Sequence, residues 1–595
     1  MKKQRNQIQD LFWLYRPYWQ YGKFFVLVSL FFWMLILPLC RVLMVIFPEQ
    51  MVRALENGWT FSKIALLVIA FQTALLVIPV FEDIYNICCR DRAQARIEIK
   101  IKKQVYEQSL RTDYCFVDQP EYYNRYMWAV EHQAEKAEEA FSLVNRALSA
   151  LTIMVTLISM IAAFNPVIVI FTLVSMALRT YGYIKYNQYE VRREESLMAS
   201  HRRLGYFHRI FYLREYKADL KSTRLKEYIF KHYDTEADHK LGIIKSYAKR
   251  LLFWAVFSDM IYRIMMTLII LLVSYSIFKA QYVEAASYIT VMLSVEKLED
   301  SMYEFFELFQ QGGKLSLYAG DIRRFYEMES TIESGKEAGG KRKPADGPFL
   351  LDMEQVGFRY PHSEFAIENF TLHIKPGEKI AIVGENGVGK STLLKLLLRL
   401  YDPLHGEIKI NQIPLPEYEL ESLRRRIGVV FQDTHMYALS LRENMELYQR
   451  IEDKKAEAML SELHLEKLMS KNAATMDTIL TKEFDEKGIV VSVGEAQKIG
   501  LARVMQGDFG LLLLDEPSSA LDPIAEYEMN QLILNRSQKA TTIVVAHRLS
   551  TVRDMDRIIV MANGCIAESG THEELMQQKG CYYQMFTKQA ENYLK

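Results

Sequence analysis

The chain has few cysteines and no excess of charge of either sign. Its 73 Lys and Arg balance 73 Asp and Glu over 595 residues, and no basic and aromatic platform for nucleic acid is present. The cysteines have no metal-site spacing, and they lie in the membrane and cytoplasmic segments described below, so we expect no disulfides. They are Cys40, Cys88, Cys89, Cys115, Cys565 and Cys581. A cleavable signal is also missing, because the first apolar run is too long and lacks a small-residue cleavage site.

Long apolar stretches are abundant in the first half of the chain. Six are long enough to cross about 30 Å of hydrocarbon, several of them only if their few charges face protein or water. They lie near residues 23–47, 60–81, 138–163, 166–187, 250–278 and 285–309. The sequence therefore predicts six membrane spans.

Lys and Arg are concentrated in the segments that an even number of spans places on one side of the membrane. Seven lie between Arg90 and Arg111, whereas the opposite side has only short loops, with Arg53 and Lys279 among its few cations. Others on the cation-rich side are Lys2, Lys3, Arg5, Arg202, Arg203, Arg209 and Arg214. We therefore expect a multi-pass protein of a bacterial-type cytoplasmic membrane with both termini in the cytoplasm.

About fifty residues of charged, helix-forming sequence separate the second span from the third and the fourth from the fifth. They should extend the membrane helices into the cytoplasm, with short elbows at Phe116–Tyr123 and Tyr216–Leu220 that either touch another domain or are solvated hairpin tips. A Gly-, Lys- and Pro-containing run has the composition of a linker. The predicted domains are 1–329 (membrane), 330–348 (linker) and 349–595.

A glycine-rich loop directly follows the apolar run Ile380–Val383. Residues 384–392 read Gly-Glu-Asn-Gly-Val-Gly-Lys-Ser-Thr, which fits the pattern GxxxxGK[ST] between a strand and a helix. Such a loop turns backbone N–H groups and a helix N-terminus toward phosphate, Lys390 can neutralise charge and Ser391 can hold Mg²⁺. The predicted nucleotide-binding residues here are Gly384, Glu385, Asn386, Gly387, Val388, Gly389, Lys390, Ser391 and Thr392. The chain is predicted to bind a nucleoside triphosphate.

A second strand ends in two carboxylates about 125 residues later, in Leu511–Glu516. An apolar run of this kind suits a strand buried on both faces, and its end would deliver Asp515 to Mg²⁺ and Glu516 to a water beside the γ-phosphate as general base. The alternative is a strand followed by an exposed acidic turn. Strand-like segments alternate with helical ones from residue 350 onward, which predicts a mostly parallel α/β sheet.

With these motifs in this order, the whole chain resembles a half-transporter of the ABC exporter family. It looks most similar to bacterial peptide, lanthipeptide-type or multidrug exporters. The resemblance implies a helical six-span transmembrane domain with long cytoplasmic helix extensions, followed by an α/β P-loop ATPase (ABC) domain. It also implies roles for four residues: Tyr360 stacks on adenine, Gln432 touches Mg²⁺, Asp522 lies in the loop that crosses to the partner, and His547 contacts the γ-phosphate. The implied cofactors are ATP and Mg²⁺, with Glu516 and His547 as the catalytic residues.

The sequence departs from that family at the signature, where Leu-Ser-Gly-Gly-Gln is replaced by Val491-Ser492-Val493-Gly494-Glu495. Ser492 and Gly494 can still face a phosphate from a helix N-terminus. Val493 adds bulk, and a β-branched residue cannot easily adopt φ > 0, so we expect it to weaken the signature. Glu495 adds negative charge near the anion, although similar sequences often carry it.

An intact hydrolytic set beside a weakened signature predicts unequal halves. The family sandwiches two ATP molecules between two chains, so the hypothesis is a different partner chain with an intact signature and a degenerate carboxylate. The alternative is a homodimer with weakened ATPase.

The sixth predicted span carries an acidic face within about 140° of a helical wheel. Its members are Glu296, Glu299, Asp300, Glu304 and Glu307, with Tyr303 and Gln310 beside them. This face lines either a cavity for a cationic amphiphile or an interhelical ion-pair network. Residues Asp113 to Trp128 and the C-terminal domain look most similar to lanthipeptide exporters, and we expect any leader peptide to be cut elsewhere, because no peptidase domain precedes the first span. The expected function is ATP-driven export of an amphiphilic substrate, and the alternative is an exporter-shaped importer or sensor.

Overall fold

The computed structural model describes residues 7–117, 120–164, 166–280, 285–328, 332, 342–360, 366–471, 474–536 and 539–594. The chain divides into two compact units. The first comprises Met1–Leu110 and Pro120–Met328, and the second comprises Arg111–Gln119 and Glu329–Lys595. The short segment at Arg111–Gln119 is therefore inserted in the sequence of the first unit but packs with the second.

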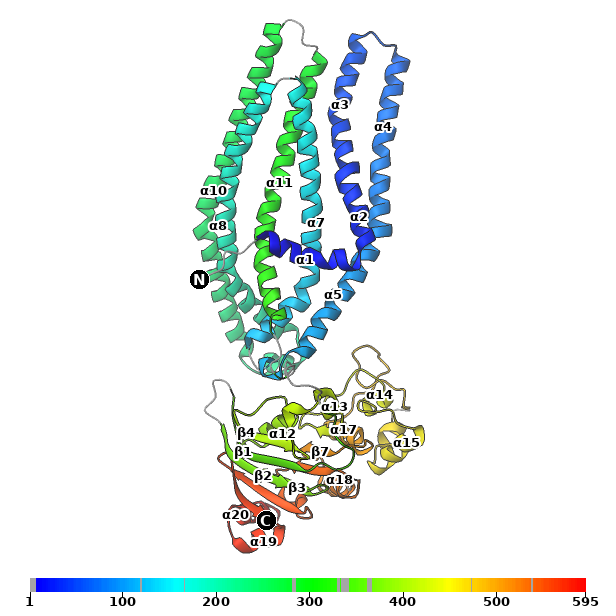
Figure 1. Ribbon diagram of the computed structural model, residues 1–595, viewed down its shortest axis with the longest axis vertical. Coiled ribbons are helices and arrows are strands. Elements are labelled where there is room, and N and C mark those ends of the chain that lie inside the picture. The colour runs from blue at the N-terminus through cyan, green and yellow to red at the C-terminus, as the bar shows by residue number, and fades with distance from the viewer. Residues whose placement is uncertain are drawn as a thin grey trace. The chain divides into compact units, whose positions relative to one another are not determined.

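The first unit is entirely helical in its described residues (Figure 1). Its helices are α1 (Gln7–Tyr21), α2 (Lys23–Phe31), η1 (Phe32–Ile36), α3 (Leu37–Glu56), α4 (Phe61–Asp83), η2 (Ile84–Arg90), α5 (Asp91–Arg111), α7 (Pro120–Phe164), α8 (Pro166–Tyr212), η3 (Arg214–Tyr216), α9 (Lys217–Ser222), α10 (Leu225–Ala280) and α11 (Ala285–Tyr326). η1 and η2 are π-helical turns within longer helical runs. α10 has 56 residues and is about 84 Å long at about 1.5 Å per residue, far more than a membrane crossing needs.

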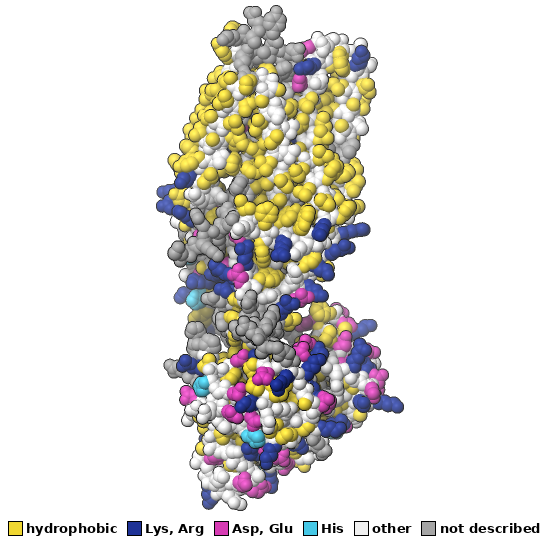
Figure 2. Space-filling model, in the orientation of Figure 1, with side chains coloured by type: hydrophobic (Ala, Val, Ile, Leu, Met, Phe, Trp, Pro, Cys, Tyr) yellow, Lys and Arg dark blue, Asp and Glu magenta, His cyan; other side chains and the backbone are white. Residues whose placement is uncertain are grey.

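Among the described residues, five helical stretches are long and apolar enough to cross a membrane: Lys23–Glu56, Phe61–Arg111, Arg125–Phe164, Pro166–Tyr212 and Leu225–Tyr275. They overlap the first five predicted spans. The sixth, residues 285–309, lies in α11, which is not among them. Large apolar side chains on the span helices are exposed, such as Leu66 (68%) and Leu76 (65%), and hydrophobic side chains form a broad band over the long helices in Figure 2. Such a surface suits lipid.

Helices of the first unit pack mainly in pairs, α7 with α11 and α8 with α10, and α1 lies across α7 and α11 (Figure 1). One apolar core joins α7, α8, α10 and α11 through residues such as Leu157, Ile168, Val273 and Val295. A second, aromatic-rich core joins α1, α2, η2, α5 and α7.

The second unit contains two sheets. A six-stranded sheet has the order β10-β9-β3-β8-β7-β6, and all of its pairs are parallel except β10 with β9. Its strands are β3 (Lys379–Gly384), β6 (Ile427–Val430), β7 (Leu511–Asp515), β8 (Thr541–Val545), β9 (Arg557–Ala562) and β10 (Cys565–Gly570). The mostly parallel sheet predicted from the sequence is present.

The prediction of one sheet was incomplete, however. A separate four-stranded sheet has the order β2-β1-β4-β5 and is antiparallel throughout. It contains β1 (Leu351–Arg359), β2 (Ala366–Ile374), β4 (His405–Ile410) and β5 (Ile413–Pro414). Its first two strands come from the strand-like sequence that begins at residue 350, which we had assigned to the parallel sheet.

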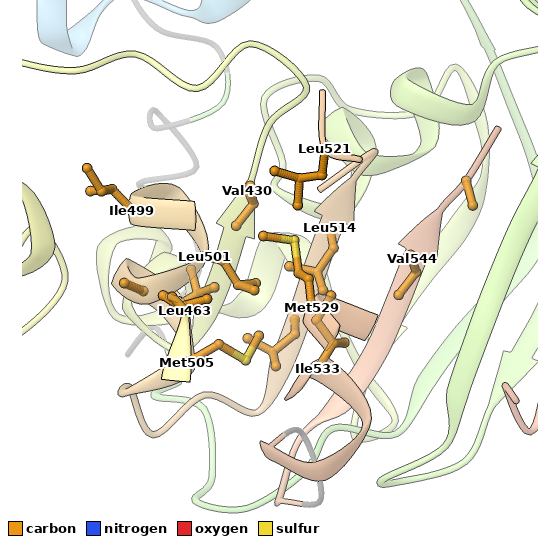
Figure 3. Packing of buried hydrophobic residues seen from close by; sticks show 14 of the residues in the cluster. Val430, Leu463, Ile499, Leu501, Met505, Leu514, Leu521, Met529, Ile533 and Val544 are labelled. Carbon is orange, nitrogen blue, oxygen red and sulfur yellow. The ribbon is translucent and has the colours of Figure 1, made fainter. Parts of the chain in front are cut away.

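Alternate residues of β3 belong to different cores. Ile380 and Ile382 pack into one hydrophobic cluster, whereas Ala381 and Val383 pack into the other, which Figure 3 shows around Leu514 and Val544. Successive side chains of a strand point to opposite faces, so the central strands are apolar on both faces because each face is covered. Helices cover the second face through Leu463, Leu501, Met505, Met529 and Ile533, which Figure 3 labels.

The parallel strands also fix the position of the chemistry. The glycine loop follows β3, Gln432 follows β6, Asp515 and Glu516 end β7, and His547 follows β8. Because carboxyl ends of parallel strands lie at one sheet edge, these four segments meet there.

Candidate functional site

The glycine loop joins β3 to α12 (Lys390–Leu397). Gly384 has φ +154°, and a Cβ there would lie 2.4 Å from the carbonyl oxygen of Met561, so a side chain is excluded. Gly389 has φ +103° and caps α12 in the left-handed region, which glycine adopts at little cost. Both glycines are buried, whereas Glu385, Asn386 and Gly387 are exposed and Val388 is half-buried between them.

Lys390 is buried at the start of α12. Its Nζ donates hydrogen bonds to the carbonyl oxygens of Gly384 and Glu385, both at 2.8 Å. Burial lowers the pKa of Lys390, and the carboxylates of Glu516 and Asp515 oppose this change. The ammonium is therefore held inside the loop, where an incoming phosphate can replace the carbonyl partners.

Asp515 and Ser391 form the candidate magnesium site. Asp515 is 4% exposed, and burial raises the pKa of its carboxyl while a hydrogen bond with the Ser391 side chain lowers it. Its Oδ1 has no hydrogen-bond partner among the described residues. A hydroxyl and a carboxylate with an unused oxygen fit Mg²⁺, which takes few protein ligands and binds through oxygen. The described residues contain no cluster of three or more His, Cys, Asp or Glu side chains that could hold a metal ion.

Glu516 is held by two of the predicted site residues. Its Oε1 lies 2.7 Å from Nε2 of His547, and Nε2 of Gln432 donates to its Oε2 at 3.3 Å. Burial raises the pKa of Glu516, His547 lowers it and Asp515 raises it. Glu516 has φ +49°, an uncommon conformation for a residue that is not glycine. That turn directly follows β7, so the exposed acidic turn that the sequence left open is excluded: the side chain is 11% exposed.

Tyr360 lies at the end of β1 beside the phosphate loop. Its hydroxyl is 3.2 Å from Oγ1 of Thr392, and its ring packs edge-on against Phe358 and Tyr401. The structure thus places the predicted adenine-stacking ring one hydrogen bond from the helix that follows the glycine loop.

The signature segment forms the start of α17 (Val493–Met505). Ser492 is its N-cap, and Glu495 completes a capping box: its carboxylate accepts from the backbone N–H and hydroxyl of Ser492 at 2.7 and 2.8 Å. Glu495 therefore stabilises the helix start. Gly494 packs closely, because a Cβ there would lie 3.1 Å from Leu521 and 3.3 Å from the carbonyl oxygen of Ala520.

One part of the argument on Val493 was wrong. Val493 is the first residue of α17 and has a helical, negative φ, so no strained conformation is required of it. Its side chain is 71% exposed. Only the bulk of the side chain remains as a reason to expect a weaker signature.

Asp522 caps α18 (Pro523–Arg536) by accepting from the backbone N–H groups of Ile524 and Ala525 at 3.1 and 3.0 Å. The hydrogen bond from Ala525 lowers its pKa. A nearby residue that we did not predict joins this loop to the signature helix. Gln497, 3% exposed, donates to Oγ of Ser519 at 2.8 Å and accepts from the N–H of Ala520 at 3.0 Å. A single glutamine inside a helix gives no sequence signal of this role.

Comparison with known proteins agrees with this geometry. The family model described as "ABC transporter" matches residues 367–519. The chain therefore contains an ABC transporter domain. It is 37% identical over 300 residues to the ATP-dependent lipid A-core flippase of Alkalilimnicola ehrlichii, a match that covers 46% of this chain and only 50% of the flippase. It is 29% identical over 554 residues to the subtilin transport ATP-binding protein of Bacillus subtilis, covering 90% of this chain and 86% of that protein.

The fold of the chain is similar to that of a solved bacterial Atm1-family ABC exporter with ATP bound. The TM-score is 0.69 at 18% identity, and the likeness covers 95% of this chain and 98% of that one. At this identity the comparison shows the fold alone. It confirms the predicted fold class, a helical membrane domain followed by an α/β ATPase domain.

The segment Arg111–Gln119, which contains only the start of the first predicted elbow (Phe116–Tyr123), packs with the second unit, whereas residues from Pro120 onward belong to the first. The short helix α6 (Tyr114–Val117) lies within Arg111–Gln119. The Tyr114 ring is 5.9 Å from the Tyr401 ring, and Nζ of Lys395 lies 5.4 Å from the centre of Tyr114 and 5.6 Å from that of Tyr360. Residues 118 and 119 of this elbow lie outside the described residues, and the second elbow forms η3 and α9.

Two acidic residues of the sixth predicted span are in ion pairs with arginines of other helices. Glu299 is 2% exposed and accepts from Arg179 at 2.8 Å and from Ser175 at 3.1 Å. Glu304 accepts two hydrogen bonds from Arg41, at 3.0 and 2.9 Å. These pairs fit the ion-pair network rather than the acidic cavity.

Two other acidic residues of that face are more exposed. Glu296 and Asp300 have side chains that are 51% and 55% exposed, with Lys297 at 4.0 and 3.2 Å. The side chains of Glu307 and Gln310 lie outside what the structure describes.

Proposed function

We propose that the chain is one half of a dimeric exporter that couples ATP hydrolysis to transport across the cytoplasmic membrane. The observation that carries this proposal is the meeting of Lys390, Asp515, Glu516 and His547 at one edge of the parallel sheet, in a chain whose described part also has five helical stretches long and apolar enough to span a membrane. The similarity to the subtilin transport ATP-binding protein, which extends over 86% of that protein, supports the proposal.

The hydrolytic roles follow from the contacts. Lys390 and the loop N–H groups bind the β- and γ-phosphates of ATP, and Tyr360 provides a ring for adenine. Ser391, Asp515 and Gln432 would hold Mg²⁺, which neutralises charge on the phosphates when bound. Glu516 takes the proton of the attacking water, and His547, which lies 2.7 Å from it, orients the carboxylate and contacts the γ-phosphate.

A second chain completes each nucleotide site in this proposal. Ser492 and Gly494 at the start of α17, together with Asp522, would face the phosphate bound by the other chain. Because Val493 adds bulk at an exposed position there, we favour a different partner chain with an intact signature. A purified chain that forms a homodimer with full ATPase activity would contradict the choice of partner without affecting the hydrolytic roles.

Coupling is proposed to pass through the first elbow. Tyr114, Lys395 and Tyr360 lie in one aromatic cluster, so a change at the adenine end of the site has a short route to α5 and α7. Hydrolysis at Glu516 would then reset the membrane helices.

The cargo is proposed to be an amphiphile and, by analogy with the subtilin transport relative, a peptide. The concentration of Lys and Arg in predicted cytoplasmic segments supports cytoplasmic termini. An importer or sensor of the same shape is the alternative.

The experiment is transport direction in sealed vesicles with the ATP-binding unit outward. Uptake of a fluorescent cationic peptide amphiphile that requires ATP and Mg²⁺ is the expected result. Efflux from preloaded vesicles, or ATPase activity without any transport of tested amphiphiles, would contradict export.

A further inference from the structure

A cavity of about 420 Å³ lies inside the membrane unit, where α1, α2, η1 and η2 approach α7. A second cavity of about 540 Å³ shares four of its lining residues, Arg90, Glu138, Ser142 and Arg146. The first has the size of ordinary small-molecule sites. It is distinct from the nucleotide site and from the acidic face of α11.

One wall of the first cavity is aromatic. Tyr85 stacks between Phe25 and Phe32, at centroid distances of 5.9 and 5.1 Å, and Phe141 stacks on Tyr18 at 4.4 Å. The hydroxyl of Tyr85 already has a hydrogen-bond partner, because it lies 2.7 Å from Oγ of Ser29. This wall offers flat apolar surface to a ring or an aliphatic chain.

The facing wall is polar and contains a buried side chain without hydrogen-bond partners among the described residues. Asn145 of α7 lines the cavity and is fully buried, yet neither its Oδ1 nor its Nδ2 has a hydrogen-bond partner in the described part of the chain. Beside it, Nε of Arg146 is likewise unpartnered, although its guanidinium donates to Gln311 at 2.9 Å. Buried polar groups in native proteins normally have partners, so this wall requires one that enters the cavity.

The charges of the lining are already balanced. Glu138 accepts from Arg90 at 3.0 Å and also from Gln94, so its carboxylate is engaged. Glu82 and Arg146 contribute one charge of each sign. A ligand therefore needs no net charge, and the demand that remains is for a group that both donates to Oδ1 and accepts from Nδ2 of Asn145.

Both π-helical turns of the described residues border this cavity. η1 supplies Phe32 and Trp33, and η2 supplies Tyr85, Asn86 and Arg90. Such turns widen a helix locally and are frequent at functional sites. Here they coincide with the cavity on two separate spans.

We propose that this cavity is a binding site for the peptide group of an amphiphilic cargo, with an apolar side chain against Tyr85 and Phe141 and the amide against Asn145. A secondary amide donates through N–H and accepts through C=O, which is the pair of bonds that Asn145 lacks. The proposal rests on the proposed export function, because it names the cargo class.

The first test measures binding of N-methyl-indole-3-propanamide and methyl indole-3-propanoate to the full chain in lipid nanodiscs without ATP. The ester lacks the secondary amide N–H but keeps the ring. We expect Asn145→Leu to weaken amide binding at least tenfold and to reduce the preference for the amide over the ester at least fivefold. The control is Ser149→Ala, one turn along α7, which removes a buried unpartnered hydroxyl that does not line the cavity. Equal affinities of the wild type and Asn145→Leu would overturn the proposal.

A second measurement does not depend on the stability of a variant. A diazirine derivative of N-acetyl-phenylalanine amide, photolysed with the wild-type chain, should label peptides that contain η2 or residues 138–146 of α7. Labelling confined to other helices would overturn the site. Retained amide binding without ATP-driven transport would instead count against export alone, and transport that persists when Asn145→Leu abolishes binding would count against this cargo site alone.

Discussion

Replacing Val493 by glycine tests whether the bulk of the signature segment limits hydrolysis. Val493 is 71% exposed at the first turn of α17, so its removal gives up less than a third of a valine's burial, about 0.5–0.8 kcal/mol. The lower helix propensity of glycine adds about 0.4 kcal/mol. The expected loss of folding stability is therefore about 1 kcal/mol, which leaves the fold intact.

The effect of Val493→Gly on the rate of ATP hydrolysis should be larger than its effect on stability, and it should be a gain rather than a loss. If the two methyl groups keep phosphate from a close approach and cost about 1–2 kcal/mol in the transition state, Val493→Gly raises ATPase activity about 5- to 30-fold. The assay is steady-state ATPase of the chain purified as a homodimer, with KM and kcat separated, because there each Val493 faces a nucleotide site that contains Glu516. In a heterodimer whose partner lacks this carboxylate, Val493 faces the inactive site and the rate should not change. Val490→Gly is the matched control, because Val490 is 65% exposed but lies outside the signature. An unchanged or lower kcat in Val493→Gly, with intact ATP binding, would refute the reasoning.

Three further predictions concern other parts of the chain. Burial raises the pKa of Glu516, so ATPase activity should fall as pH drops through a value above the pKa of an ordinary glutamate. Because His547 lowers the pKa of Glu516, His547→Ala should move this acidic limb of the pH–rate profile to higher pH. A limb that stays in place or moves to lower pH would contradict the pairing of the two residues. Tyr114→Ala should keep ATPase activity but reduce transport per ATP several-fold, whereas Tyr106→Ala on α5, also exposed, should not; equal transport per ATP in both variants would remove the elbow from coupling. Arg179→Leu should destabilise the membrane unit by about 3–5 kcal/mol, since it leaves Glu299 buried and unpaired, whereas Lys297→Leu, which breaks an exposed pair, should cost at most about 1 kcal/mol; similar melting temperatures for both variants would contradict a buried ion pair.

The sequence predicted the family and the parallel sheet because the relevant physics is local. A strand, a glycine loop and a helix define the phosphate loop within about fifteen residues, and an apolar run that ends at Asp515 and Glu516 defines the neighbouring strand end. The roles of these site residues remain predictions that the experiments above address.

Features that depend on distant packing were not predictable in the same way. The antiparallel sheet was missed because two of its strands, β4 and β5, are short or polar and are defined by the strands with which they pair. The φ of Val493 was misjudged because a capping box between Ser492 and Glu495 starts α17 at Val493, which gives this residue a helical backbone. The cavity beside Asn145 is lined by seven separate helical segments, and no local pattern marks it.

The central claim is that the carboxylate of Glu516 drives hydrolysis and that hydrolysis drives transport. The most direct measurement compares ATP hydrolysis and ATP-driven uptake by the wild type and Glu516→Gln in the same sealed vesicles, with nucleotide binding measured in parallel. We predict retained ATP binding with hydrolysis and uptake both reduced at least about 100-fold, as expected for loss of a general base. Hydrolysis and uptake at wild-type rates in Glu516→Gln would contradict the account.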